Sequence, residues 1–306
     1  MNNQNSPEII TINDGNFGSH VEHWNLLTDE PTLEVPKWLG QALDAPVMPM
    51  GLCRSESEMD ENTWLIQGPK NSPILLSQII AVENNKPQAV KTAFPCFNSP
   101  FKTEATIERV ITCKSNTQAV LCLNLGNNTT AYAFDTLYSV NNGCYKKDQK
   151  YSIRLYGWAY ELELVSDHEQ LIVDDPASIK HHRALNAILA ENNGVAPNNL
   201  QEQIDAWEPQ CEEDKEPVTV DFSKMVAYLY GEKIGQEDEA WCQSKIVGKS
   251  TFDFMNQTYT FYDITLFAEE NEPAVLARIA TKDPQYKDFQ IGQYIRGNIW
   301  LQANIF

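Results

Sequence analysis

The clearest pattern in the chain is a series of short apolar stretches in its middle part, separated by turns rich in Asn, Gly, Ser and Thr. The stretches lie at residues 105–114, 119–125 and 131–138. Such stretches with such turns are typical of antiparallel strands. A longer aromatic stretch, Tyr151 to Val165, follows without an intervening helix. We therefore expect residues 101–166 to form a small OB-like β-barrel, closed by an antiparallel meander.

The last part of the chain repeats this texture and predicts a second barrel of the same kind over residues 218–306. Its strand-like stretches lie at residues 244–254, 258–267, 274–280 and 294–303. Just before them, apolar residues recur at helical spacing between 221 and 230, so a short helix is expected there. The predicted fold class is thus mostly β, of the α+β type.

Residues 167–217 separate the two predicted barrels and differ from them in composition. The segment from Asp174 to Gly194 has a carboxylate suited to an N-cap, Pro176 suited to the first turn and a glycine suited to a left-handed end. This predicts one connecting helix. The acidic stretch at 198–217 is typical of a linker or a surface loop.

Residues 1–100 are interrupted repeatedly by proline and asparagine, and they predict a mixed α/β region. A short helix is expected at 36–43, where Pro36 suits the first turn. The apolar stretch from Ile74 to Val82 fits a helix capped by Ser72 or a buried strand, and the pattern does not separate the two.

Two strand-like segments about 140 residues apart repeat the pattern Ile-Arg-x-x-x-Trp. They are Ile153-Arg-Leu-Tyr-Gly-Trp158 and Ile295-Arg-Gly-Asn-Ile-Trp300. Each follows an apolar strand and a polar loop that contains a Tyr-Lys pair, so the sequence predicts an internal duplication of one β-module.

Alternate side chains of a strand point to opposite faces, which divides each repeated segment into an apolar face and an Arg/aromatic face. Arg, Trp and Tyr are frequent anchors at interfaces, so we expect the second face to bind a partner. The predicted binding residues are Arg154, Tyr156, Trp158, Tyr160, Arg296 and Trp300. The alternative is that these side chains fill a barrel or pack between the two modules.

The segments at 131–138, 151–163 and 291–302 together resemble those of an uncharacterised family of bacterial proteins with two OB-like β-barrel modules. The resemblance covers about the last two-thirds of the chain. It implies the fold, and it implies no activity.

The net charge of −19 is unevenly distributed along the chain. Residues 164–217 carry −9, whereas residues 101–163 carry +1. An acidic surface repels phosphates, which argues against non-specific nucleic-acid binding and allows a basic protein partner. Solubility alone is the simpler explanation of the charge.

The seven cysteines are widely spaced and include no CxxC pair, which favours free thiols in a reducing compartment. The first residues do not have the pattern of a secretory signal, and no apolar run approaches the length of a membrane helix. We therefore expect a cytoplasmic protein that does not enter a membrane.

Phosphate-cradling glycine motifs, a GxSxG elbow and an HExxH motif are missing from the sequence. The pair His181 and His182 is a weak candidate for metal ligands, because the side chains of adjacent residues on a helix point about 100° apart. Glu161 and Glu163 share a strand face, but a solvated strand end explains them as well. No metal and no cofactor is expected.

These observations favour a non-catalytic binding or assembly protein that recognises another protein through its β-barrel surfaces. An OB-type nucleic-acid-binding protein is the first alternative, and it would use the same Arg and Trp side chains. An enzyme whose site is assembled from distant residues is the second.

Overall fold

The computed structural model describes residues 6–13, 22–49, 51–52, 62–126, 129–268 and 273–306. Strands hold 47% of the residues and helices 18%, so the prediction of a mostly β chain is confirmed. The chain divides into two compact units. Unit 1 comprises Met1–Leu164 and Val226–Phe306, and unit 2 comprises Val165–Met225.

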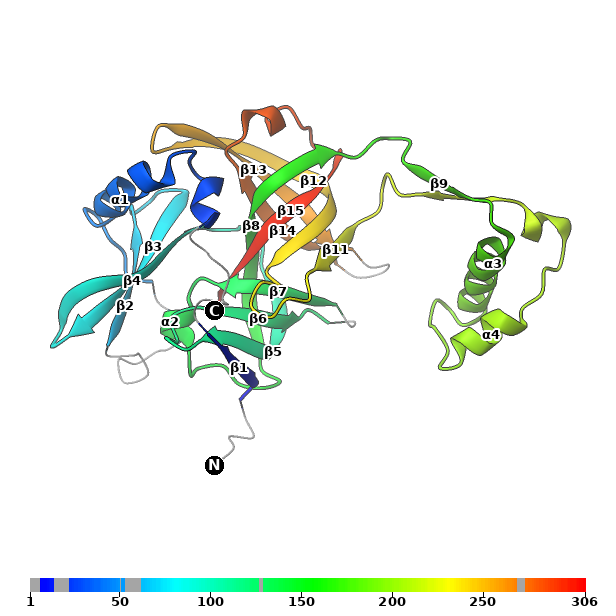
Figure 1. Cartoon of the computed structure of the whole chain (residues 1–306), viewed down its shortest axis with the longest axis horizontal. Coiled ribbons are helices and arrows are strands. Elements are labelled where there is room, and N and C mark those ends of the chain that lie inside the picture. The colour runs from blue at the N-terminus through cyan, green and yellow to red at the C-terminus, as the bar shows by residue number, and fades with distance from the viewer. Residues whose placement is uncertain (1–5, 14–21, 50, 53–61, 127–128, 269–272) are drawn as a thin grey trace. The chain divides into compact units, whose positions relative to one another are not determined.

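Unit 1 is built on one ten-stranded mixed sheet (Figure 1). Its strands are β1 (Glu8–Ile12), β5 (Thr103–Cys113), β6 (Ala119–Asn124), β7 (Thr130–Asp135), β8 (Lys150–Leu164), β11 (Ala227–Tyr230), β12 (Glu239–Phe254), β13 (Gln257–Phe267), β14 (Val275–Thr281) and β15 (Tyr294–Ile305). They follow the order β1-β5-β6-β7-β15-β8-β14-β13-β12-β11. The strands of the two predicted modules thus share one sheet rather than forming two separate barrels.

Two additional pairings, β5 with β8 and β15 with β12, close this sheet into two rings of strands. The first ring runs β5-β6-β7-β15-β8, and the second runs β12-β13-β14-β8-β15. In each ring the first three strands are antiparallel neighbours, and the third is parallel to the strand that the other half supplies. Strands β8 and β15 therefore belong to both rings.

The antiparallel pairing of β8 with β15 is the central ladder of the unit. Trp158 lies directly opposite Trp300, and the register shifts by a bulge beyond Ile299. A β-carbon on Gly157 would lie 2.7 Å from the carbonyl oxygen of Trp300, and one on Gly297 would overlap the carbonyl of Glu161. The glycine in each repeated segment is thus required by the close approach of the two strands.

Side chains on the two faces of the sheet enter two separate cores. The first core lies inside the rings and contains Ile153, Leu155, Ile299 and Leu301. The predicted apolar faces of both repeated segments supply these residues. The second core lies on the outer face, where the aromatic side chains of the ladder meet the N-terminal part of the chain.

The N-terminal part forms a layer over this outer face (Figure 1). The layer comprises η2 (Glu22–Leu26), α1 (Pro31–Ala42), β2 (Thr63–Gly68), β3 (Ile74–Glu83) and β4 (Lys86–Phe97). Its strands form a separate sheet in the order β2-β3-β4. The stretch from Ile74 is therefore a strand, and the predicted short helix begins five residues earlier than expected, with Pro31 in its first turn.

Short helical segments fill the same position in both rings, between the third strand and the strand shared with the other ring. They are α2 (Tyr138–Asn141) and η5 (Pro284–Tyr286). Tyr145 and Tyr286, which belong to the repeated Tyr-Lys pairs, are both buried in the inner core. The hydroxyl of Tyr262 donates to the carbonyl of Tyr286.

Unit 2 is a two-stranded ribbon that carries helices. It comprises β9 (Gln170–Val173), α3 (Pro176–Glu191), α4 (Leu200–Ala206), η4 (Glu212–Lys215) and β10 (Val218–Asp221), with β9 antiparallel to β10. Asp175 caps α3 by accepting the backbone N–H of Ser178 at 2.9 Å, and Gly194 has the left-handed φ of 82° after the helix. Both end signals of the predicted helix are thus used.

The prediction of a helix at 221–230 is wrong. β10 ends at Asp221, and Ala227–Tyr230 forms the strand β11. Tyr228 packs against the inner core while Leu229 is 64% exposed, so neighbouring side chains point to opposite sides as in a strand. In this short segment, pairing with β12 outweighs the helical spacing of the apolar residues.

No helix in the described part of the chain has both the length and the apolar character needed to cross a bilayer.

Candidate binding surface and pocket

Three of the six predicted binding residues are completely buried in the outer core. Tyr156, Trp158 and Trp300 each have 0% of their surface exposed. The ring of Phe97 in the N-terminal layer lies 4.8 Å from that of Tyr156 and 5.1 Å from that of Trp158. These side chains hold the layer to the sheet, so a partner has no direct access to them.

Arg154 and Arg296 lie at opposite ends of the central ladder, because the two repeated segments run antiparallel about the Trp158–Trp300 pair. Arg154 pairs across the ladder with Asn304, and its guanidinium lies 5.0 Å from the centre of the Phe306 ring. The structure therefore does not bring the two Ile-Arg segments together into one continuous surface.

The other end of the ladder carries the part of this face that remains open to solvent. A row of residues crosses four neighbouring strands there, from Glu161 on β8 to Asn298, Trp241 and Leu229. Leu229 is 64% exposed, which is high for a leucine. Tyr160 and Arg296, two of the predicted binding residues, lie beside this row.

We call this surface the ladder patch. It consists of Tyr160, Glu161, Glu163, Leu229, Trp241, Arg296 and Asn298. The amide of Asn298 donates to Glu161 at 2.8 Å, and the guanidinium of Arg296 forms an ion pair with Glu163. Both carboxylates therefore have partners on β15. Their position fits the solvated strand end that was one interpretation of Glu161 and Glu163 from the sequence. The patch is polar at its centre and apolar toward β11.

The middle of the ladder adjoins His23, whose ring stacks on Trp300 with centroids 3.9 Å apart and lies 6.0 Å from the ring of Tyr160. Its Nε2 lies 3.2 Å from a carboxylate oxygen of Glu239, and the indole N–H of Trp300 donates to Asp238 at 2.8 Å. His23 is only 3% exposed. The contacts of His23 with Glu239 and Trp300 join residues more than 200 positions apart, so no local sequence pattern predicts them.

The weakest metal candidates, His181 and His182, both lie on α3 in unit 2. His181 is exposed, and Nδ1 of His182 is 3.1 Å from the side-chain amide of Asn186. Among the residues that the structure describes, no group of three or more His, Cys, Asp or Glu side chains is arranged to hold a metal ion.

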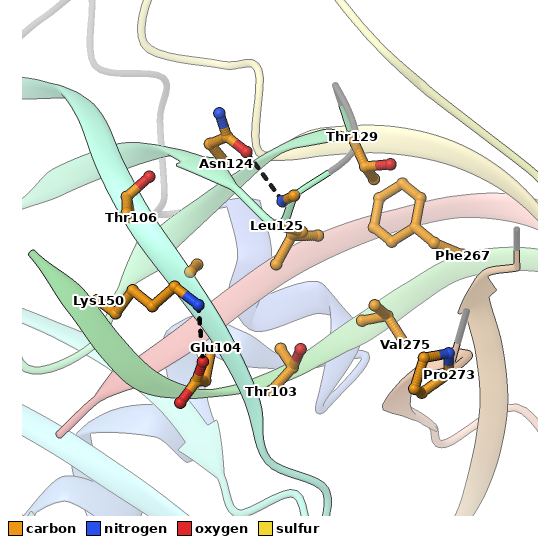
Figure 2. Close-up of a pocket in the computed structure, with 12 residues that line it drawn as sticks. Thr103, Glu104, Thr106, Asn124, Leu125, Thr129, Lys150, Phe267, Pro273 and Val275 are labelled. Atoms are coloured by element: carbon orange, nitrogen blue, oxygen red, sulfur yellow. Dashed lines mark hydrogen bonds and ion pairs between the residues drawn. The ribbon is translucent and has the colours of Figure 1, made fainter. Parts of the chain in front are cut away.

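A pocket of about 500 Å³ lies where the first ring meets the turn between β13 and β14 (Figure 2). Its apolar wall comes from Leu125, Phe267 and Val275, which also pack against the inner core. The opposite wall is polar, with hydroxyl groups and the ion pair of Lys150 with Glu104 at 3.2 Å. No sequence pattern predicts this pocket, because five strands and two connecting segments contribute its lining.

A buried polar network lies at the other end of the first ring. Asp135 is 1% exposed, and its carboxylate accepts the N–H of Leu137 at 2.9 Å and the hydroxyl of Tyr145. Burial raises the pKa of Asp135 to about 7, although the hydrogen bonds from Leu137 and Tyr145 act in the opposite direction and lower it. The neighbouring Thr136 bonds to the hydroxyl of Tyr156 at 2.8 Å. The network thus connects the ring to the aromatic ladder.

The described cysteines other than Cys144 are free thiols, as predicted, but Cys144 is disulfide-bonded, so the prediction is wrong for this residue. Burial raises the pKa values of Cys96 and Cys242 to about 12. These two thiols therefore stay protonated near neutral pH, which makes them poor nucleophiles and suits a packing role.

Comparison of the chain with protein families, with characterised proteins and with solved structures finds no match in any of the three.

Proposed function

We propose that the chain is a non-catalytic binding or assembly protein that recognises another protein through the ladder patch. The observation that carries the proposal is the row across β8, β15, β12 and β11, which has Leu229 and Trp241 at one end and Tyr160 and Arg296 beside the other. Aromatic and arginine side chains around an exposed apolar residue are the composition that protein interfaces favour.

The form of this surface supports a protein partner. It is a broad strand face on regular secondary structure, so its side chains keep their relative positions without a ligand. The ion pair of Arg296 with Glu163 and the bond of Asn298 to Glu161 place polar groups on one side of the apolar residues, on β8 and β15. An apolar contact with a polar rim is the usual arrangement of such an interface.

The acidic balance of the chain supports a basic partner. Unit 2 contributes strongly, because the stretch at 164–217 carries −9 of the total of −19. Complementary charge would speed the encounter of the two proteins and suppress binding of acidic ones. The wide spacing of the cysteines supports a cytoplasmic setting for this interaction, whereas the disulfide at Cys144 weighs against a reducing compartment.

We further infer that the two rings are OB-like modules derived by duplication, each of which gives its last strand to the other. Three features support this inference. The two rings follow the same strand order, the repeated segments occupy β8 and β15, and the repeated Trp158 and Trp300 pair with each other. The N-terminal layer and the connecting helix are additions to this pair.

A nucleic-acid-binding function is the second candidate, and the ring topology is the observation that favours it. OB modules bind single strands on a basic groove with aromatic stacking platforms. The burial of Tyr156, Trp158 and Trp300 under the N-terminal layer weighs against it here. Gel shifts with single-stranded DNA and RNA at low salt test it directly, and retardation of either would favour this candidate over protein recognition.

The main proposal is tested by affinity capture at low salt from the cells that produce the chain. We expect one defined protein to bind the wild type and to be lost with the double variant Tyr160→Ala/Arg296→Ala. The double variant Lys86→Ala/Lys91→Ala, on the exposed strand β4, is the matched control and should retain the partner. Capture that is insensitive to the ladder-patch variant, or no specific partner at all, would refute the proposal.

A further inference from the structure

We propose that β11 is the docking edge for an extended, basic segment of the partner, which adds to the ten-stranded sheet as one more strand. This inference rests on the proposed function, because it specifies the kind of partner segment that meets the ladder patch. It adds a backbone-directed mode of binding that the patch alone does not define.

The edge strands of unit 1 differ in how they are protected against pairing. Strand β4 is the edge of the three-stranded sheet, and its exposed half carries Lys86, Pro87 and Lys91. Charge and proline at such positions are the usual means of blocking strand addition. At one end of the ten-stranded sheet, β1 begins with Glu8, which forms an ion pair with Arg109 at 2.7 Å.

Strand β11, at the other end of that sheet, lacks these protective residues. Its sequence, Ala227-Tyr-Leu-Tyr230, contains neither a charge nor a proline, and β12 is its neighbour on one side only. An uncharged edge of β-prone residues is a template for another strand.

The inward side chains of β11 hold the strand in place for this role. The hydroxyl of Tyr228 donates to the carbonyl of Tyr132 at 3.2 Å, and the ring of Tyr230 lies 4.7 Å from that of Tyr132. The strand therefore needs no ordering when a partner binds, which lowers the entropic cost of docking.

The outward side of β11 gives an incoming strand one apolar contact. Leu229 faces outward, and Trp241 lies directly across from it on β12. An added strand would place alternate side chains beside Leu229, so the partner segment should carry apolar residues at every second position. The remaining positions would face the opposite side of the sheet.

Charge selects a basic partner over a second copy of the chain. Two copies would each carry −19, and their repulsion opposes an edge-to-edge dimer through β11. Glu161 and Glu163 lie on β8, three strands away from β11, and both have partners on β15. The net negative charge of the chain is therefore what favours a segment with lysine or arginine at its polar positions.

The experiment uses three synthetic ten-residue peptides and the full-length chain, with binding followed by fluorescence anisotropy. The first peptide alternates lysine and valine, the second is the same peptide N-methylated at every backbone nitrogen, and the third alternates glutamate and valine. We expect the first peptide to bind and the other two to bind at least about tenfold more weakly. For the methylated peptide, a tenfold loss of affinity corresponds to about one hydrogen bond.

Variants of the chain locate the site. Leu229→Lys places a charge on the edge and should weaken the lysine–valine peptide about tenfold. Ile9→Lys on β1 is the matched control, because Ile9 is 61% exposed and lies at the opposite edge of the same sheet. It should leave binding unchanged. Urea unfolding of both variants confirms that each is folded.

Each other outcome counts against the strand-addition proposal. Failure of the lysine–valine peptide to bind, equal binding of its N-methylated form, or equal loss in both variants overturns it. A dimer in sedimentation that Leu229→Lys abolishes would identify a second copy as the occupant instead. The proposed function is judged separately, because its capture experiment depends on Tyr160 and Arg296 rather than on Leu229.

Discussion

Trp158 and Trp300 lie directly opposite each other in the antiparallel ladder of β8 and β15, yet their indole N–H groups have different surroundings. The N–H of Trp300 donates to the buried carboxylate of Asp238 at 2.8 Å. The N–H of Trp158 has no hydrogen-bond partner among the described residues. Two residues in equivalent positions of the repeat thus carry different interactions.

This difference predicts unequal costs for the same substitution. Trp300→Phe removes a hydrogen bond to a charged group, which contributes about 1.5–3 kcal/mol, in addition to the lost ring volume. Trp158→Phe removes volume alone. We therefore expect urea unfolding to show Trp300→Phe as the less stable variant by about that amount. Equal losses would show that the bond to Asp238 contributes nothing.

The close approach of the two ladder strands predicts that alanine is not tolerated at their glycines. A β-carbon on Gly157 would lie 2.7 Å from the carbonyl oxygen of Trp300, so Gly157→Ala must push the strands apart. The expected loss is about 1–3 kcal/mol of unfolding free energy, as for other overpacked sites.

Gly40 provides the control for this substitution. It lies inside α1, and a β-carbon there would meet no atom within 4 Å. Gly40→Ala should raise the free energy of unfolding by about 0.5–1 kcal/mol, because alanine favours the helix. If both variants changed stability in the same direction, the steric account of Gly157 would be wrong.

Asp135 predicts a dependence of stability on pH. Its pKa is raised from 3.8 to about 7 in the folded chain, so the folded state binds the proton more tightly than the unfolded state. Its contribution to stability is fully present below pH 3.8 and is lost as the pH rises through about 7, by at most about 1.4 kcal/mol per pH unit.

Asp135→Asn isolates this contribution, because the amide has no charge to bury and keeps the shape of the side chain. We expect the difference in unfolding free energy between pH 5 and pH 8 to favour pH 5 more strongly in the wild type than in the variant. Urea titrations at the two pH values measure it. An unchanged difference would mean that Asp135 does not titrate in this range.

The ion pair of Arg278 with Asp263 predicts that lysine cannot replace this arginine. Two guanidinium nitrogens donate to the two carboxylate oxygens at 2.7 and 3.1 Å, and both side chains are largely buried. Arg278→Lys keeps the charge and loses the bidentate geometry, so we expect a loss of about 1 kcal/mol. Arg109→Lys, at the more exposed pair with Glu8, should cost less in the same unfolding assay.

Local structure could be predicted from the amino-acid sequence wherever one pattern ruled out the others. Turn residues between apolar stretches identified most strands of the two rings, and Asp175, Pro176 and Gly194 defined α3. The pattern also assigned the apolar face of each repeated segment to a core. These features depend on neighbours in the chain, so a single sequence contains them.

The use of the repeated segments depends on long-range packing. This packing made β8 and β15 common to both rings and covered Tyr156, Trp158 and Trp300 with the N-terminal layer, although their pattern resembled a binding face. Amphipathic aromatics and arginines serve equally well against solvent, a partner or another part of the chain. The choice depends on what residues more than a hundred positions away bring to that face, and alternation along a strand carries no information about this.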